Sequence, residues 1–269
     1  MKTYHFLAGL PRSGNTLLSS ILNQNKNIFS SPISPINSII WNYFETINTN
    51  ENALKYSDRE RFDSLGKKLI DNFYFDVDKP VIIDREKCWA TPANFNLIKS
   101  YVTSTPKVIF TVRPIIDVLT SFITILPERS FIDIEMEENG WWSKNHLSIN
   151  DNRCDYLMRP FGQIDKITTS ANIILNPEHK DCFCVIEYDE IVNNPKETMS
   201  KIYDFLELPY YQHDFNNIKK VEDDVDEAYG HPKDLHKIRP KINKISKRPE
   251  DVLSDYVLNK YSNLEWWRK

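Results

Sequence analysis

Short apolar runs alternate along the chain with stretches whose apolar residues recur at helical spacing. Four runs read as strands covered on both faces, because polar residues bound each of them; they are residues 3–8, 79–84, 107–112 and 182–188. Helical spacing extends from Leu17 to Leu22 and over residues 92–102, 114–126, 155–175 and 195–206. This alternation predicts a single α/β domain over residues 1–269, with three layers and a mostly parallel central sheet flanked by helices.

Two segments break this rhythm. Residues 127–154 are polar and weakly periodic, and they contain Trp141 and Trp142. We expect them to form an insertion that lies over a site, with an excursion across the surface as the alternative. Residues 216–248 carry an acidic half followed by a basic half.

Composition narrows the range of partners. The chain has 269 residues, of which 41% are hydrophobic, and a formal net charge of −4. That charge provides no general basic field for duplex nucleic acid, so we expect no nucleic-acid partner and only a local site for a small anion.

The four cysteines have no C-x-x-C spacing and predict neither a disulfide nor a zinc framework. No apolar run approaches the ~20 residues of a membrane span, and the first strand starts at Thr3, which leaves no room for a leader. We therefore expect a cytoplasmic protein.

The stretch GLPRSGNT joins the first strand to the first helix. Backbone N–H groups and the helix dipole point at one place in such a turn, so it binds an anion whatever side chains it carries. Gly14 permits close approach, and Ser13 and Thr16 can add hydroxyl donors. Asn15 stands where nucleotide hydrolases have the lysine for a γ-phosphate, and Arg12 places a cation inside the loop.

The third strand indicates a site without a metal. Nucleotide hydrolases hold magnesium with an aspartate at the end of a second apolar strand, whereas here that position is Arg113. Ser121 lies about two helical turns beyond Pro114 and projects from the same face as the helix start. Arg113 and Ser121 can therefore hold one phosphate together. Two phosphate-binding sites, the loop with Arg12 and the pair of Arg113 and Ser121, fit a nucleoside that carries separate 5′ and 3′ phosphates.

These motifs resemble those of sulfotransferases that use 3′-phosphoadenosine-5′-phosphosulfate (PAPS). GLPRSGNTLL resembles the family's loop for the 5′-phosphosulfate, and VRPIIDVLTSF resembles its 3′-phosphate motif, an arginine followed eight positions later by a serine. VIEYDEIVNNPKETMSKIYDFLELP resembles the strand and helix around the family's Tyr-Glu-Asp sequence. The likeness covers essentially the whole chain and is especially close to a bacterial and phage-like branch, through HDF at 213–215 and GHPKDLHKIR at 230–239.

The resemblance implies a P-loop-like sulfotransferase fold and a metal-independent transfer from PAPS, with adenosine 3′,5′-bisphosphate (PAP) as product. It assigns Arg12 to the 5′-phosphosulfate, surrounded by donors from Ser13, Gly14, Asn15 and Thr16, and it assigns Arg113 and Ser121 to the 3′-phosphate. Lys87 best matches a basic residue that contacts the sulfuryl group in related enzymes, and Tyr188 matches a tyrosine beside the adenine. Residues 216–248 would fold back over the nucleotide and bring His236 and Arg239 toward it.

The general base is where the resemblance fails. Tyrosine-modifying relatives have a glutamate about twenty residues after the loop arginine, and this chain offers Pro32 in that neighbourhood. Asp84, at the end of the second predicted strand, is our first choice, and the remaining candidates are Glu86, His146, His213 and His236.

The acceptor is expected to be a hydroxyl or amine of a small molecule, a carbohydrate or a phenol. Two other functions stay open. A P-loop kinase of a small metabolite is the other enzyme class, and a nucleotide-binding protein without activity would explain the absent glutamate.

Overall fold

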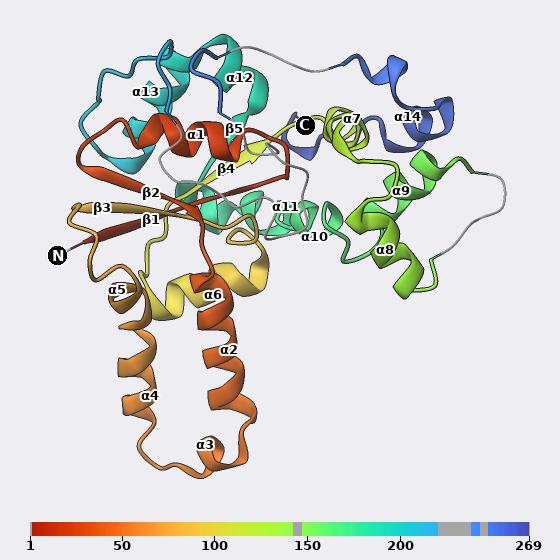
Figure 1. Ribbon diagram of the computed structural model, residues 1–269. Helices are drawn as coiled ribbons and strands as arrows, with labels where there is room; N and C mark the ends of the chain where they lie inside the picture. Colours follow the sequence, from red (N-terminus) through yellow and green to blue (C-terminus); the bar gives the residue numbers. More distant parts are fainter. Residues whose placement is uncertain (1, 142–146, 220–237, 243–246, 269) are drawn as a thin grey trace.

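The computed structural model describes residues 2–141, 147–219, 238–242 and 247–268 (Figure 1). Its centre is a five-stranded sheet in the order β2-β3-β1-β4-β5, in which every neighbouring pair is parallel. The strands are β1 (Thr3–Gly9), β2 (Ile28–Ile33), β3 (Val81–Arg85), β4 (Val108–Val112) and β5 (Phe183–Glu187). The predicted α/β class with a parallel central sheet is confirmed.

Strand β2 was not predicted from the sequence. This strand contains Ser30, Ser31 and Pro32 instead of an apolar run, and it lies at one edge of the sheet. An edge strand tolerates proline because one of its sides needs no hydrogen-bonding partner. The four strands that were predicted are all present, with ends that differ by only a residue or two.

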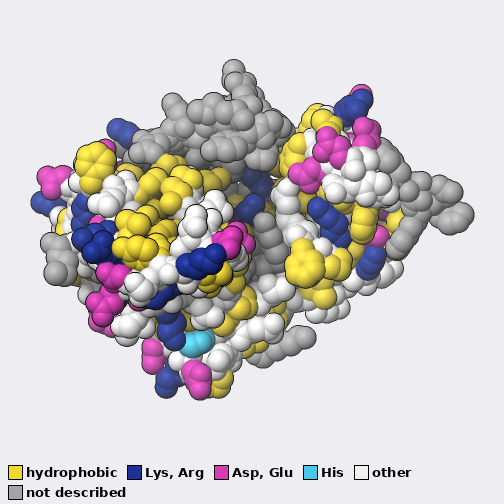
Figure 2. Space-filling model, turned by 90° about the horizontal axis from the view of Figure 1, so that it is seen from below, with side chains coloured by type: hydrophobic (Ala, Val, Ile, Leu, Met, Phe, Trp, Pro, Cys, Tyr) yellow, Lys and Arg dark blue, Asp and Glu magenta, His cyan; other side chains and the backbone are white. Residues whose placement is uncertain are grey.

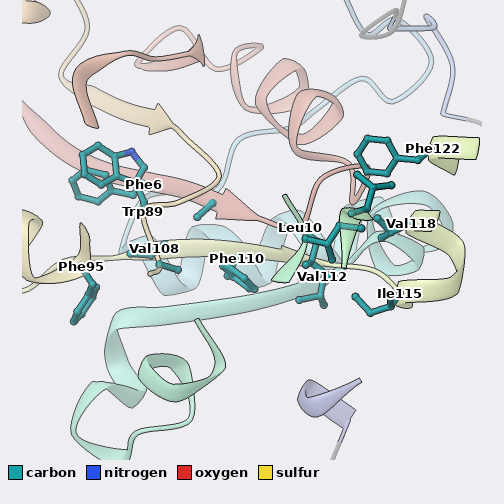
Figure 3. Packing of buried hydrophobic residues seen from close by; sticks show 14 of the residues in the cluster. Phe6, Leu10, Trp89, Phe95, Val108, Phe110, Val112, Ile115, Val118 and Phe122 are labelled. Atoms are coloured by element: carbon teal, nitrogen blue, oxygen red, sulfur yellow. The ribbon is translucent and has the colours of Figure 1, made fainter. Parts of the chain in front are cut away.

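Helices cover both faces of the sheet. One face is covered by α1 (Asn15–Leu22), α12 (Tyr188–Asn193) and α13 (Pro195–Leu206), whose apolar residues pack in one cluster with alternate side chains of the strands. The other face is covered by α6 (Pro92–Tyr101) and α7 (Ile115–Ile125), and Figure 3 shows this packing from Phe95 and Trp89 to Phe122. Helices α1, α6, α7 and α13 match the predicted helical segments closely.

Between β2 and β3 the chain forms a helical projection that points away from the sheet (Figure 1). Its helices are α2 (Ile36–Thr49), α3 (Glu51–Lys55), α4 (Arg59–Gly66) and α5 (Leu69–Phe73). The Asn50 side chain caps α3 by accepting hydrogen bonds from the amides of Asn52 and Ala53.

Residues 127–154 are more regular than their polar composition suggested. They include α8 (Phe131–Glu138) and most of α9 (Ile149–Leu157), and each of these helices starts with a capping box, at Ser130 and at Ser148. An ion pair between Asp133 and Arg153, with an N···O distance of 2.6 Å, joins the two helices, and Ile132, Met136 and Cys154 are buried in the apolar core. Trp142 and His146 lie outside the described residues.

The single long helical pattern expected over residues 155–175 is wrong. Helix α9 ends at Leu157, and only two short helices follow, α10 (Asp165–Thr168) and α11 (Ala171–Ile174). A turn separates them from α9, in which Phe161 has a φ of 62° and a Cβ on Gly162 would lie 2.7 Å from the Leu157 carbonyl oxygen. The turn can therefore form only where a glycine stands.

The end of the chain packs back onto the domain. Helix α14 (Asp255–Tyr261) is fixed to α9 through Asp155, whose carboxylate accepts hydrogen bonds from Tyr256, Lys260 and Tyr261. The described residues also include the 3-10 helices η1 (Pro177–Cys182), η3 (Pro249–Asp251) and η4 (Trp266–Arg268). In the part of the chain that the structure describes, no helix is both long and apolar enough to cross a bilayer.

Candidate active site

The candidate site lies where β1 ends, at the centre of the sheet. Strand β1 pairs with β3 on one side and with β4 on the other, so the strand order changes direction at this place. Open parallel sheets bind ligands at the carboxyl ends of their strands, at such a switch point. Figure 2 shows a hollow between the body of the molecule and the part that carries α8 and α9, with Lys and Arg side chains beside it.

The loop after β1 depends on two glycines. Gly9 has a φ of 142°, and a Cβ there would lie 2.3 Å from the carbonyl oxygen of Thr111 on the neighbouring strand. Gly14 has a φ of 92°, and a Cβ there would lie 3.0 Å from the ring of Tyr188. Between them Arg12 adopts a φ of 63°, which is uncommon for a residue other than glycine. The loop is thus held in one strained shape, as is typical of functional sites.

Side chains of the loop itself maintain this shape. The Ser13 hydroxyl is fully buried, donates to the Leu10 carbonyl oxygen at 2.5 Å and contacts the Thr111 hydroxyl at 2.6 Å. The Asn15 side chain donates from Nδ2 to the same Leu10 oxygen at 3.1 Å, and its Oδ1 accepts from the Thr111 hydroxyl at 2.9 Å. Both side chains therefore face the sheet, so what Ser13 and Asn15 can offer an anion is their backbone N–H groups.

Arg113 and Ser121, which the sequence assigns to one phosphate, each contact Arg12. Arg12 Nε donates to Ser121 Oγ at 3.1 Å, and Arg113 Nη1 donates to the Arg12 carbonyl oxygen at 3.1 Å. The Arg12 side chain of the loop thus lies beside Ser121, the serine of the VRPIIDVLTSF motif. The two motifs that the sequence assigns to phosphates are thus joined through Arg12.

Arg113 has the feature that most clearly indicates a ligand. Its side chain is only 4% exposed, yet its Nη2 has no hydrogen-bond partner among the described residues. The nearest carboxylate oxygen, of Asp117, lies 4.0 Å from Nε. Tyr188 supports the guanidinium from one side, with its ring centroid 4.5 Å from Cζ. A buried guanidinium that keeps a donor open is suited to an oxyanion such as phosphate.

A second buried arginine at the site was missed in the sequence. Arg85 ends β3, is 5% exposed and donates from Nη1 to the Thr16 hydroxyl at 2.7 Å. The signal was available, because Arg85 ends one apolar strand just as Arg113 follows another. Lys87, two residues later, is half-buried, and its carbonyl oxygen accepts from the amide of Gly9 at 3.5 Å. Three cationic side chains besides Arg113 therefore come from segments that touch the loop.

Comparison with known proteins identifies the family. The family model described as a sulfotransferase domain matches residues 2–227. The chain belongs to the sulfotransferase family. A search of curated proteins finds no match.

Solved structures agree with the fold of this sulfotransferase. A sulfotransferase domain from the curacin biosynthetic pathway is 16% identical, with a TM-score of 0.58 over 97% of this chain and 98% of that one. A sulfotransferase domain from the Synechococcus PCC 7002 olefin synthase is 16% identical, with a TM-score of 0.52 over 89% of this chain and 84% of that one. A sulfotransferase from Alicyclobacillus acidocaldarius is 14% identical, with a TM-score of 0.50 over 85% and 90% of the two chains. The protein is a transferase of sulfuryl groups, and its expected enzyme class is confirmed.

The structure gives Asp84 a structural position in this sulfotransferase. Asp84 is fully buried on the face of β3 opposite to Arg85, and its carboxylate accepts hydrogen bonds from the Tyr74 hydroxyl and from Trp89 Nε1, the latter at 2.6 Å. Burial raises the pKa of Asp84 to about 6. Because both oxygens are engaged beneath the sheet, the carboxylate cannot reach a substrate at the loop. We therefore withdraw Asp84 as the base.

His213 is not brought to the loop either. His213 is buried between Tyr211 and Phe215, with ring centroids 5.1 and 6.1 Å away, and burial lowers its pKa to about 4. The adjacent Asp214 exchanges two hydrogen bonds with Gln24 beyond the far end of α1, opposite to the end that carries the loop. His146 and His236 lie outside the described residues.

Glu86 and Arg239 complete the predicted set. Glu86 is half-buried and accepts from the Cys88 amide at 3.3 Å, so it closes the turn after β3. Arg239 is exposed, beside Ile238, which packs against the face covered by α1 and α13. No group of three or more His, Cys, Asp or Glu side chains that could hold a metal occurs among the residues that the structure describes.

Proposed function

We propose that this sulfotransferase moves the sulfuryl group of PAPS to a hydroxyl or amine of a small acceptor, such as a carbohydrate or a phenol, without a metal ion. The observation that carries the proposal is the open donor of the buried Arg113 beside a glycine-dependent anion loop. PAPS supplies a sulfuryl group on its 5′-phosphate and a separate 3′-phosphate. The residues present fit both groups, as the following assignments set out.

The 3′-phosphate would be held by Arg113 and Ser121. Arg113 Nη2 is buried without a partner in the described structure, and burial of an unsatisfied donor costs about 1–3 kcal/mol unless a ligand accepts from it. Ser121 adds a hydroxyl that already contacts Arg12. The ring of Tyr188 lies against Arg113 and also beside Gly14, where it is the nearest group to a Cβ built on that glycine. This position supports its assignment beside the nucleotide.

The 5′-phosphosulfate would lie over the backbone N–H groups of residues 13–16. Arg12 belongs to this loop, Arg85 is fixed beside it by its bond to Thr16, and Lys87 contacts it through its backbone carbonyl oxygen. Sulfuryl transfer builds negative charge on the oxygen that remains with the 5′-phosphate, and fixed cations stabilise such charge in the transition state. Positioning by the loop and charge stabilisation by these side chains are thus the contributions that we assign to the protein.

The segment over residues 127–154 and the C-terminal segment over 216–248 are assigned to the acceptor and nucleotide sides, respectively. Helices α8 and α9 border the hollow seen in Figure 2, which supports a role for the first segment in covering the acceptor. In the second segment, the amide of Ile218 donates to the carbonyl oxygen of Pro240 at 2.8 Å, so the chain doubles back beside Arg239. Arg239 remains our candidate for a contact to the nucleotide.

The test is transfer itself. The protein is incubated with PAPS and a panel of phenols, sugars and amines in the presence of EDTA, and products are detected by mass spectrometry. We expect a sulfated acceptor and an equal amount of PAP, with no loss of rate in EDTA. Release of neither product, combined with phosphorylation of a metabolite from ATP and magnesium, would favour the kinase. Binding of PAP without any transfer would favour a protein that only binds the nucleotide.

A further inference from the structure

The last described residues of the chain are fixed to the end of β5. Arg268 Nε donates to Glu187 Oε1 at 2.8 Å, and Arg268 Nη2 donates to the other carboxylate oxygen. Trp267 Nε1 donates to Glu187 Oε1 at 3.2 Å. The guanidinium and the carboxylate therefore form a two-point contact, a geometry that fixes orientation as well as distance.

Glu187 occupies a position from which it can control the nucleotide site. It is the last residue of β5 and pairs in register with Val112, which directly precedes Arg113. It is also the N-cap of α12, and its amide donates to Glu190 at 2.7 Å in a capping box. The next residue, Tyr188, carries the ring that lies against Arg113. A shift of Glu187 would thus move the ring that orients the guanidinium.

The same C-terminal segment also contacts the strand that leads to Arg113. Trp266 packs against Phe110 of β4, with ring centroids 6.2 Å apart, and lies edge-on to Trp267 at 5.5 Å. The segment therefore bridges β4 and β5, the two strands that directly precede Arg113 and Tyr188. Figure 1 shows the C-terminus beside this end of the sheet.

We propose that Glu187 and Arg268 form a positioning pair that holds Tyr188 against Arg113 and thereby sets the affinity for the 3′-phosphate of the nucleotide. Neither residue needs to touch the nucleotide, because both act through the ring of Tyr188. The inference rests on the proposed function, in which Arg113 receives the 3′-phosphate. It predicts an effect that depends on the 3′-phosphate and not on the 5′ end.

The experiment compares PAP with adenosine 5′-monophosphate, which lacks the 3′-phosphate, by isothermal titration calorimetry. Arg268→Gln removes the charge, Arg268→Lys keeps the charge without the two-point geometry, and Lys55→Gln is the matched control. Lys55 also makes an ion pair, with Glu51 at 2.5 Å, but on α3 at the far end of the helical projection. Amide hydrogen exchange of α12 in the ligand-free protein provides a readout that needs no nucleotide.

Arg268→Gln should weaken PAP binding about 5- to 10-fold, as expected for members of one hydrogen-bonded network, and change binding of the monophosphate less than about 2-fold. The PAP affinity of Arg268→Lys should lie between those of the wild type and Arg268→Gln, and that of Lys55→Gln should equal the wild-type value. Amide hydrogen exchange at the start of α12 should be faster in Arg268→Gln than in the wild type. Unchanged PAP binding in Arg268→Gln, or equal losses for both nucleotides, would overturn the inference. A wild-type protein that binds both nucleotides equally would overturn the proposed function itself, so the two failures are distinguishable.

Discussion

Arg113 and Arg153 are both 4% exposed, yet their surroundings differ completely. Arg153 donates to both oxygens of Asp133, at 2.8 and 2.6 Å, and its Nη2 also donates to the carbonyl oxygens of Pro127 and Glu128 at 2.9 Å. Arg113 has one bond, to a backbone oxygen, and an Nη2 with no partner in the described structure.

This difference separates an arginine whose donors the fold satisfies from one that keeps a donor open among the described residues, which supports our assignment of Arg113 to a ligand. A buried charge is tolerated when its partners replace the lost water, and Asp133 and the carbonyl oxygens do this for Arg153. Among the described residues Arg113 lacks such replacement, and it lies beside the loop that we propose binds an anion. Burial alone would not have distinguished the two residues, whereas the count of satisfied donors does.

The largest effect is expected when the fully partnered arginine is removed. Arg153→Ala would leave the buried carboxylate of Asp133 unpaired, which should lower the free energy of unfolding by about 3–5 kcal/mol. Urea unfolding measures the loss. A loss below about 1 kcal/mol, the range of a surface ion pair, would contradict the structural role. Arg153→Met combined with Asp133→Leu should recover most of the stability, because no buried charge then remains.

Removal of the open arginine should act on binding. Arg113→Ala should weaken PAP binding by about 1.5–3 kcal/mol, or roughly 10- to 100-fold, which is the range for hydrogen bonds to charged groups. Binding of adenosine 5′-monophosphate should change much less, and stability should fall less than in Arg153→Ala. Calorimetric titration with both nucleotides measures the difference, and equal losses would break the assignment of Arg113 to the 3′-phosphate.

Asp84 should behave like Arg153, since both of its oxygens are engaged. Asp84→Asn should leave kcat within a few-fold of the wild type, whereas loss of a general base would reduce it about 10²- to 10⁴-fold. The pKa of Asp84 is raised to about 6 in the folded protein, above its ordinary value near 4. The folded state therefore binds more protons between about pH 4 and pH 6, and stability is lost as the pH rises through this window. Asp84→Asn should abolish this loss in urea unfolding curves recorded at several pH values.

His213 sharpens the comparison, because it too is buried and neither ring nitrogen has a hydrogen-bond partner among the residues that the structure describes. Aromatic rings surround it, and burial lowers its pKa to about 4. The unfolded chain then binds more protons between about pH 4 and pH 6.5, so stability falls as the pH drops through that window. His213→Phe keeps the ring and should flatten this fall by roughly 1 kcal/mol or more, since one pKa unit corresponds to about 1.4 kcal/mol. A PAP affinity that falls in this variant would show that unpartnered polar atoms here do mark a ligand site.

The sequence predicted the parts of the fold whose chemistry is local. Apolar strands and helical spacing located most of the sheet and its covering helices, and the loop residues and Arg113 were recognisable from the ends of those strands. It did not predict β2, whose position at an edge permits Ser30, Ser31 and Pro32. Nor did it predict helices over residues 127–154, where capping boxes and a buried ion pair accompany only a few buried apolar residues.

The candidate site was predicted less completely than the fold. The joint action of Arg113 and Ser121 stays a prediction, which the contacts of both residues with Arg12 support. Asp84 was misjudged, because the alternation of side chains along β3 turns it away from the loop and turns Arg85 toward it. Which face of a strand carries the site depends on the neighbouring strands, and a single run of residues does not contain that information.

The most direct test of the central claim is a crystal structure of the protein with bound PAP. We predict that the 3′-phosphate lies within hydrogen-bonding distance of Arg113 Nη2 and Ser121 Oγ, that the 5′-phosphate lies on the amides of residues 13–16, and that no metal ion bridges them. A 3′-phosphate bound away from Arg113, or a magnesium ion between the phosphates, would contradict the account.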